Sequence, residues 1–335
     1  MNGKIKEIGS EFWDVPTTNQ QNKLFPKSTQ WYLSGRSALQ AIIKELSAAR
    51  SVSLPSWCCD SMLKPFIEAG LEVHFYPVTF DGCFVQDIKL DTEVLFLMDY
   101  FGYTTPFPDL SGYKGVIIRD VTHSIFSSTY YDADYYFGSL RKWCGVWSGG
   151  YAWTRDRHML EKGEADKGEY IKLRSRAMEE KLDYIEGRCA EKKYLKIYDA
   201  AEECLETTGI VAADERDVES ALRLDVEKIK KQRRANAEVL RTSFPEWLIF
   251  PTLSNADTPM FVPVIVPDGK RDALRRHLIN NKIYCPIHWP KSEYHRLDEM
   301  TEHIYKNELS LVCDQRYTEE DMNRMVESIK GFMER

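Results

Sequence analysis

The segment "ADYYFGSLRKWCGVWSGGYAW", residues 133–153, places Arg141 and Lys142 among aromatic and small side chains that otherwise indicate buried structure. A lysine in such a place can lay its stem over the aromatic rings while its ammonium group reaches water. A desolvated lysine, by contrast, loses its charge easily, and its neutral amine is a nucleophile toward carbonyl groups. The segment therefore allows two interpretations of Lys142, and the surrounding chain has to distinguish them.

Apolar runs alternate with segments of helical period between residues 31 and 153. The stretch "SALQAIIKELSAA" (37–49) repeats apolar residues at helical spacing, and "SMLKPFIEAG" (61–70) predicts a second helix that ends at its glycine. Strands are predicted within 51–57, 71–78, 92–102, 114–124, 133–140 and 149–154. This alternation predicts an α/β fold with a mostly parallel sheet covered by helices on both faces.

The second half of the chain predicts a smaller unit. Residues 155–214 are polar and charged, with "EKGEADKGEY" as the most loop-like stretch, and residues 215–244 then predict one long helix. A strand-like "MFVPVIVP", a helix over 270–281 and a last helix over 318–335 form a second α/β unit. We therefore expect an N-terminal segment (1–30), a large domain (31–240) and a small C-terminal domain (241–335).

Composition narrows the function classes. The chain has 335 residues and a formal net charge of -7, which gives no general attraction to nucleic acid or to an anionic membrane. The most apolar run, "VLFLM" (94–98), is too short to cross a membrane, and the first residues have no signal-peptide core. Eight cysteines without CxxC spacing are typical of a reduced protein, so we expect a cytoplasmic location.

Polar residues follow three of the predicted strands, where an open α/β sheet binds ligands. Asp120 ends "GVIIRD" and His123 follows in "VTHS", although an aspartate in this place is also a common turn or cap residue. Trp57 leaves the strand "SVSLPSW" and is either a stacking surface or a core aromatic. Gly35, Arg36 and Ser37 open the first predicted helix, whose N-terminus would attract an anion, although the serine could be a simple N-cap residue.

Together these residues supply an anion cradle, an aromatic face, a carboxylate and a lysine. Pyridoxal phosphate (PLP) requires those four groups, and Ser139, three residues before Lys142, could add a hydroxyl to the phosphate site. The ordered stretches "SGRSALQAI", "LPSWCCDSM", "VIIRDVTHS", "DYYFGSLRKW" and "SGGYAW" resemble fold-type I PLP enzymes, and within them the DegT/StrS sugar aminotransferase family. The resemblance covers roughly residues 31–153 and extends more weakly to the C-terminus.

The resemblance implies a role for each of these positions. Lys142 would hold the cofactor covalently and shuttle a proton, and Asp120 would pair with the pyridine nitrogen. Trp57 would stack on the ring and His123 would lie near its edge. The phosphate would be bound by Gly35, Arg36, Ser37 and Ser139, although the family usually has Gly-Thr in place of Gly35-Arg36. The family also implies a homodimer, but its Asn-x-x-x-Arg segment is not recognisable between residues 157 and 214.

The implied activity is transfer of an amino group from an amino acid, glutamate first, to a keto-sugar, either free or nucleotide-linked. A lyase or dehydratase on a sugar is the first alternative, but related sugar dehydratases carry histidine at this position, so Lys142 argues against that branch. A non-catalytic regulatory relative is the second alternative, against which the intact Asp120, Ser139 and Lys142 argue.

The C-terminal region offers two further candidates. His288 in "CPIHWP" is a candidate substrate-facing residue, and Arg316 in "QRY" could bind a carboxylate or phosphate or form a structural ion pair. His288, His295 and His303 match no metal-ligand spacing, so no metal site is expected.

Overall fold

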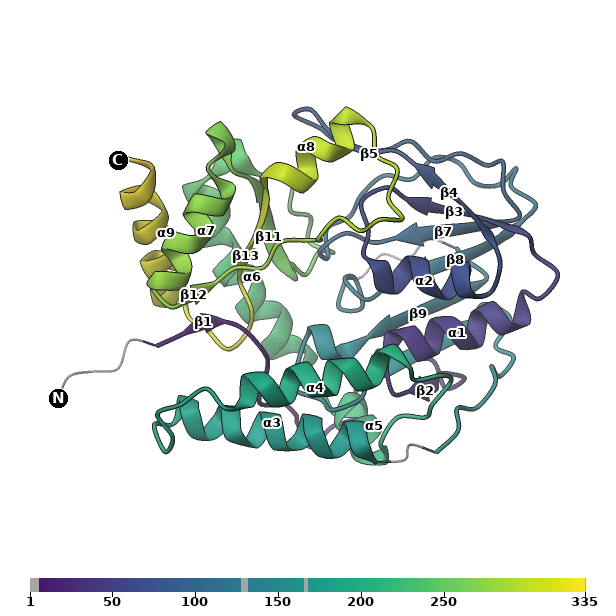
Figure 1. The fold of residues 1–335 in the computed structure, drawn as a ribbon, viewed down its shortest axis with the longest axis horizontal. Coiled ribbons are helices and arrows are strands. Elements are labelled where there is room, and N and C mark those ends of the chain that lie inside the picture. Colours follow the sequence, from purple (N-terminus) through teal and green to yellow (C-terminus); the bar gives the residue numbers. More distant parts are fainter. Residues whose placement is uncertain (1–5, 128–131, 166–167, 335) are drawn as a thin grey trace.

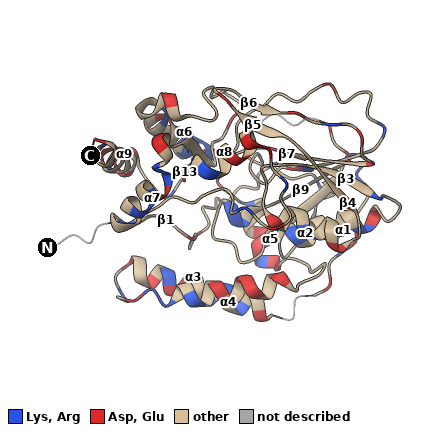
Figure 2. Cartoon of the chain, turned by 45° about the horizontal axis from the view of Figure 1, so that its top comes forward, with Lys and Arg blue, Asp and Glu red and all other residues tan. Residues whose placement is uncertain are grey.

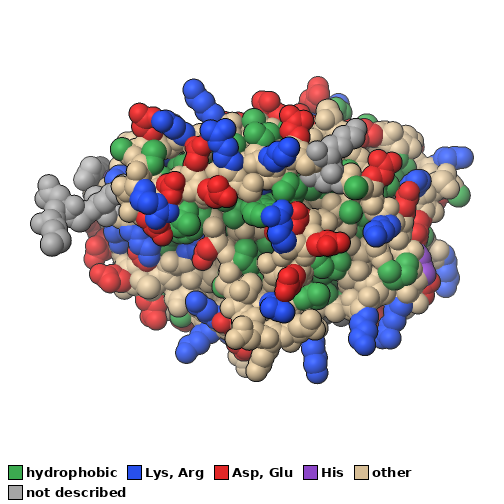
Figure 3. All heavy atoms as spheres, turned by 90° about the horizontal axis from the view of Figure 1, so that it is seen from below, with side chains coloured by type: hydrophobic (Ala, Val, Ile, Leu, Met, Phe, Trp, Pro, Cys, Tyr) green, Lys and Arg blue, Asp and Glu red, His purple; other side chains and the backbone are tan. Residues whose placement is uncertain are grey.

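The computed structural model of the protein describes residues 6–127, 132–165 and 168–334. The first five residues of the expected N-terminal segment thus lie outside the described part. Within this part, no helix is both long and apolar enough to cross a membrane. The face seen from below carries acidic and basic side chains interspersed with apolar ones (Figure 3).

A seven-stranded sheet in the order β2-β10-β9-β8-β7-β3-β4 forms the centre of the larger part of the molecule (Figure 1). Its strands are β2 (Gln30–Tyr32), β3 (Ser51–Pro55), β4 (Glu72–Tyr76), β7 (Val94–Met98), β8 (Val116–Asp120), β9 (Tyr135–Ser139) and β10 (Gly150–Thr154). Neighbouring strands are parallel except where β10 pairs with β2 and β9. The mostly parallel sheet predicted from the sequence is therefore confirmed.

Each strand sends alternate side chains to opposite faces of the sheet, and each face has its own apolar core. Phe137 and Ala152 belong to the core under α1 (Gly35–Glu45) and α2 (Asp60–Glu68). Tyr136, Tyr151 and Trp153 belong to the core on the other face, which α5 (Glu215–Leu222) and α6 (Val226–Ser243) help to close. Helices therefore cover both faces, and the site must lie at the carboxyl edge of the strands.

One predicted helix is in fact two. The expected single helix over 215–244 is wrong, because the chain breaks between α5 and α6 at residues 223–225. Asp225 caps the second helix by accepting a hydrogen bond from the Lys228 amide at 3.1 Å, and Leu224 forms a β-bridge with Thr17. Capping and a tertiary contact thus override the continuous helical pattern.

The polar region after β10 contains a helical hairpin that the sequence pattern did not predict. Helix α3 (Glu169–Ile185) packs against α4 (Tyr194–Glu206), and both carry interspersed charges (Figure 2). A small cluster that includes Ala177, Met178 and Tyr198 lies within the hairpin. So few apolar residues over so long a stretch give a weak periodic signal, which explains the omission.

A separate apolar core lies in the C-terminal part. It is built on β11 (Phe261–Ile265), β13 (Glu308–Val312), α7 (Arg271–Asn280) and α9 (Glu319–Met333). The N-terminal β1 (Ile8–Gly9) joins this part by pairing with β12 (Ile283–Tyr284). Helix α8 (Glu299–Asn307) instead packs on β5 (Val78–Phe80), which pairs with β6 (Phe84–Gln86). Segments from both ends of the chain therefore approach the edge of the large sheet.

Candidate active site

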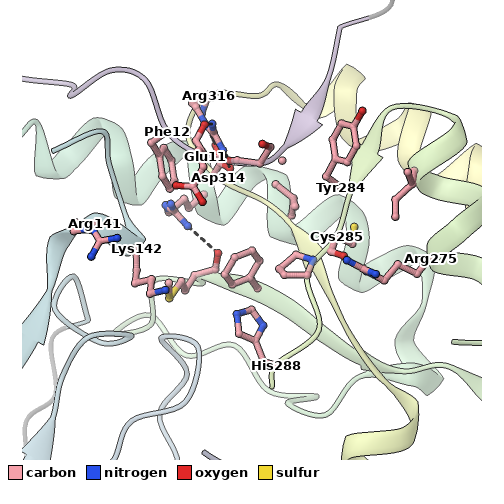
Figure 4. A pocket seen from close by; sticks show the side chains of 18 of the residues that line it. Glu11, Phe12, Arg141, Lys142, Arg275, Tyr284, Cys285, His288, Asp314 and Arg316 are labelled. Carbon is pink, nitrogen blue, oxygen red and sulfur yellow. Dashed lines mark hydrogen bonds and ion pairs between the residues drawn. The ribbon is translucent and has the colours of Figure 1, made fainter. Parts of the chain in front are cut away.

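Lys142 lies in a single 3-10 turn (Leu140–Lys142) directly after β9. Leu140, Trp143 and Cys144 are fully buried, and the indole Nε1 of Trp143 donates a hydrogen bond to the Thr122 carbonyl at 2.5 Å. The lysine side chain is exposed between these buried neighbours because it reaches into a cavity of about 530 Å³ (Figure 4). The structure therefore presents the Lys142 amine to a cavity and does not bury it.

Asp120 and His123 lie next to Lys142 at the carboxyl end of β8. The Asp120 carboxylate accepts a hydrogen bond from the Thr122 amide at 2.8 Å, but burial dominates and raises the pKa of Asp120 to about 6. Burial, with a smaller contribution from Lys142, lowers the pKa of His123 to about 3, so this imidazole is neutral. Its Nδ1 accepts the Phe101 amide at 3.2 Å. The structure thus brings a buried acid and a neutral imidazole to the lysine.

Trp57 is fully buried within a group of aromatic rings. It stacks on Tyr100 with ring centroids 5.1 Å apart, and its Nε1 donates to the His288 carbonyl at 2.5 Å. Cys59 reaches the site instead: burial raises the pKa of its thiol, and Lys142 and Asp120 both act on it electrostatically. Its position in the turn between β3 and α2, as the N-cap residue of α2, is the signal that could have found this residue in the sequence.

The predicted phosphate cradle is only partly present. Gly35 packs closely on Ser139, since a Cβ at Gly35 would lie 3.3 Å from the Ser139 Cβ. Ser37, however, donates its hydroxyl hydrogen to the Gly209 carbonyl at 2.8 Å, and the Arg36 guanidinium donates to the Leu205 carbonyl at 2.9 Å. Both side chains bond to backbone carbonyls at the C-terminal end of α4 or just beyond it, so the structure does not support them as phosphate ligands.

The two C-terminal candidates have different surroundings. His288 lines the cavity together with Lys142, as expected of a substrate-facing residue (Figure 4). Arg316 also lines it, but its guanidinium pairs with the Asp314 carboxylate at 2.8–2.9 Å and donates to the Glu11 and Ser10 carbonyls. Arg316 is therefore the structural ion pair that the sequence left open, and it anchors the N-terminal segment.

Further charged residues in the cavity were not singled out in the sequence. Glu11 pairs with Arg174 at 3.2 Å, and Arg141 pairs with Glu202. Burial alone would raise the pKa of Glu11, but Arg174, Arg141 and Lys142 together lower it to about 2. These residues come from the N-terminal segment, the turn after β9 and the helical hairpin, so only tertiary structure brings them together.

The described residues fit PLP at three places. Lys142 offers an amine in the cavity, Asp120 is a buried carboxyl group close to it, and Ser139 has no hydrogen-bond partner for its hydroxyl within the described ranges. A buried carboxyl group whose pKa is raised by burial would be stabilised by a protonated ring nitrogen. The donor set thus suits the amine-binding and nitrogen-binding ends of this cofactor, and Ser139 with Gly35 suits the phosphate end.

Comparisons with known proteins bear on the fold. No model of a protein family matches the sequence, and no curated protein matches it. An aminotransferase of the DegT DnrJ EryC1 StrS group from Brucella abortus has a TM-score of 0.62 at 14% identity, over 91% of this chain and 85% of that one.

Two further solved structures are similar. The putative sugar aminotransferase Spr1654 from Streptococcus pneumoniae, in its PLP-form, has a TM-score of 0.62 at 13% identity, over 95% of this chain and 92% of that one. PseC of Helicobacter pylori, an aminotransferase involved in the biosynthesis of pseudoaminic acid, has a TM-score of 0.59 at 13% identity, over 96% and 99% of the two chains. The chain therefore has the fold of these sugar aminotransferases.

Proposed function

We propose that this protein is a PLP-dependent aminotransferase that moves an amino group from an amino acid, glutamate first, to a keto-sugar. The observation that carries the proposal is the Lys142 amine in a cavity beside the buried carboxyl group of Asp120. The shared fold of the sugar aminotransferases supports the choice of reaction and of substrate class.

When bound, PLP supplies a carbonyl carbon for an amine and a ring that withdraws electrons. Lys142 would hold the cofactor through this carbonyl, and its Nζ, when free, would take a proton from the substrate Cα and return one. The Asp120 carboxylate would hold the ring nitrogen protonated. His123 stays neutral, because burial and the nearby lysine disfavour its cationic form.

The first experiment locates the cofactor. Borohydride reduction of the loaded protein, followed by peptide mapping, should place the pyridoxyl group on Lys142. Lys142→Ala should lose this modification, whereas Lys89→Ala, an exposed lysine paired with Asp87, should keep it. A pyridoxyl group on any other lysine would refute the assignment.

The second experiment tests the reaction without knowledge of the acceptor. Glutamate alone should abolish the visible absorbance of the loaded protein and release stoichiometric 2-oxoglutarate, because the first half of a ping-pong cycle needs no second substrate. Lys142→Ala should show neither change. If no amino acid converts the loaded wild-type protein, a lyase or a non-catalytic relative replaces the aminotransferase interpretation.

A further inference from the structure

A chain of three side chains connects the cavity to a buried carboxyl group. Glu308 and Ser310 are two residues apart on β13 and therefore share one face of that strand. The Ser310 hydroxyl lies 2.5 Å from Glu308 Oε1, and His288 Nδ1 lies 2.8 Å from the same hydroxyl oxygen. The backbone amide of His288 also donates to Glu308 Oε2 at 2.8 Å, and this bond holds the His288 backbone beside β13.

The chemistry of a hydroxyl group links the hydrogen positions in this chain. Ser310 has one hydrogen to donate, so donation to an ionised Glu308 leaves only a lone pair for His288. Nδ1 of the neutral imidazole must then carry the proton, and Nε2 is bare. If Glu308 is protonated, every bond can reverse: Glu308 donates to Ser310, Ser310 donates to Nδ1, and Nε2 carries the proton.

The opposite edge of the imidazole belongs to the cavity. His288 lines the cavity with Lys142, and its ring packs between Phe261 at 5.0 Å and Phe101 at 5.2 Å (Figure 4). Its Nε2 has no hydrogen-bond partner among the described residues. Glu308 and Ser310 are fully buried at the other end. The three residues thus lead from the cavity into the protein interior.

We propose that His288, Ser310 and Glu308 form a proton relay that accepts a proton from the ammonium group of the amino donor. The relay rests on the proposed function, because an amino acid enters as an ammonium ion and must become a free amine before it attacks. The donor proton passes to Nε2, the Nδ1 proton passes to Ser310, and the serine proton passes to Glu308. An ammonium ion and a carboxylate become a neutral amine and a neutral carboxylic acid, so protons and charge balance.

The charged and titratable groups around the relay determine its response to pH. Arg271 of α7 is the cation that acts on the Glu308 side chain, but its guanidinium donates to the backbone carbonyl of Glu308 at 3.0 Å. Lys142 and His123 are the groups that face His288. Burial raises the pKa of Glu308 to about 8, and burial keeps the pKa of His288 well below its usual range. The imidazole is therefore neutral throughout, and the relay is ready to accept a proton when Glu308 is ionised.

A first test needs neither cofactor nor substrate. Nitrogen-15 NMR of labelled histidine in the full chain, with His288→Gln used for assignment, should show the Nε2–H tautomer of His288 at low pH. The tautomer should change to Nδ1–H as the pH rises through about 8. Glu308→Gln should abolish this change, because a carboxamide does not titrate. A single His288 tautomer throughout the titration of the wild-type protein would overturn the relay.

The second test uses the loaded enzyme and measures the rate at which glutamate abolishes the cofactor absorbance. Glu308→Gln and Ser310→Ala should lower this rate by on the order of 100-fold and remove its rise with pH, and Ser310→Thr should restore part of both. Glu302→Gln on α8 is the matched control and should behave as wild type. A wild-type protein that no donor converts would overturn the proposed function, whereas normal conversion by Glu308→Gln would overturn the relay alone.

Discussion

Glu308→Gln should change how the stability of the protein depends on pH. Glu308 is fully buried, and burial raises its pKa from the ordinary 4.5 to about 8 in the folded protein. The unfolded chain releases this proton near its ordinary pKa, whereas the folded protein keeps it up to about pH 8. Folding therefore binds a proton in the window between the two values, and stability falls as the pH rises through that window.

The size of the effect follows from the two pKa values. Each pH unit within the window changes the free energy of unfolding by about 1.4 kcal/mol, so raising the pH from about 5.5 to about 7.5 removes roughly 2.5 kcal/mol. For a chain of 335 residues this corresponds to a fall in Tm of roughly 3 to 4 °C. Glu308→Gln lacks this contribution, so its Tm should rise by that amount relative to wild type over the same interval.

Thermal unfolding of the full chain in one buffer series over this pH range measures the difference. Glu302→Gln is the control: Lys291 and Lys306 lower the pKa of Glu302, so this residue is ionised in both the folded and the unfolded chain throughout the window. Its Tm should therefore run parallel to that of the wild type. Parallel curves for wild type and Glu308→Gln would refute the reasoning, because they would mean that Glu308 does not titrate within the window.

Three further predictions concern the site and the assembly. Asp120→Asn should retain the cofactor spectroscopically but lose on the order of 100-fold in turnover, because an amide cannot hold a ring nitrogen protonated; near-normal turnover at saturating substrate would remove Asp120 from this role. Gly150→Ala should destabilise the protein by about 1–3 kcal/mol in denaturant unfolding, since the added methyl would collide with the Ser34 carbonyl, and an unchanged midpoint would contradict this packing. Light scattering should find a two-fold dimer, and an active monomer at assay concentration would exclude it.

Much of the large sheet could be predicted because strand and helix periods are local properties of the chain. The same local signals place Asp120, His123 and Ser139 at or just after the ends of strands, and parallel strands end at one edge of a sheet. The helix over 215–244 shows the limit of this reasoning. Its pattern is continuous, but Asp225 caps a new helix and Leu224 contacts Thr17, about 200 residues earlier in the chain.

The sequence by itself determined the mostly parallel sheet and the place of Lys142 just after β9, since strand and helix periods depend on neighbours along the chain. Only the tertiary structure decided which polar groups are free to act. Ser37 and Arg36 bond to carbonyls at or just beyond the C-terminal end of α4, and Arg316 pairs with Asp314, so their donors are occupied. Glu308, by contrast, contacts His288 only because folding places β13 beside residue 288. The physical reason is that hydrogen-bond partners and burial depend on segments far apart in sequence, which no local period encodes.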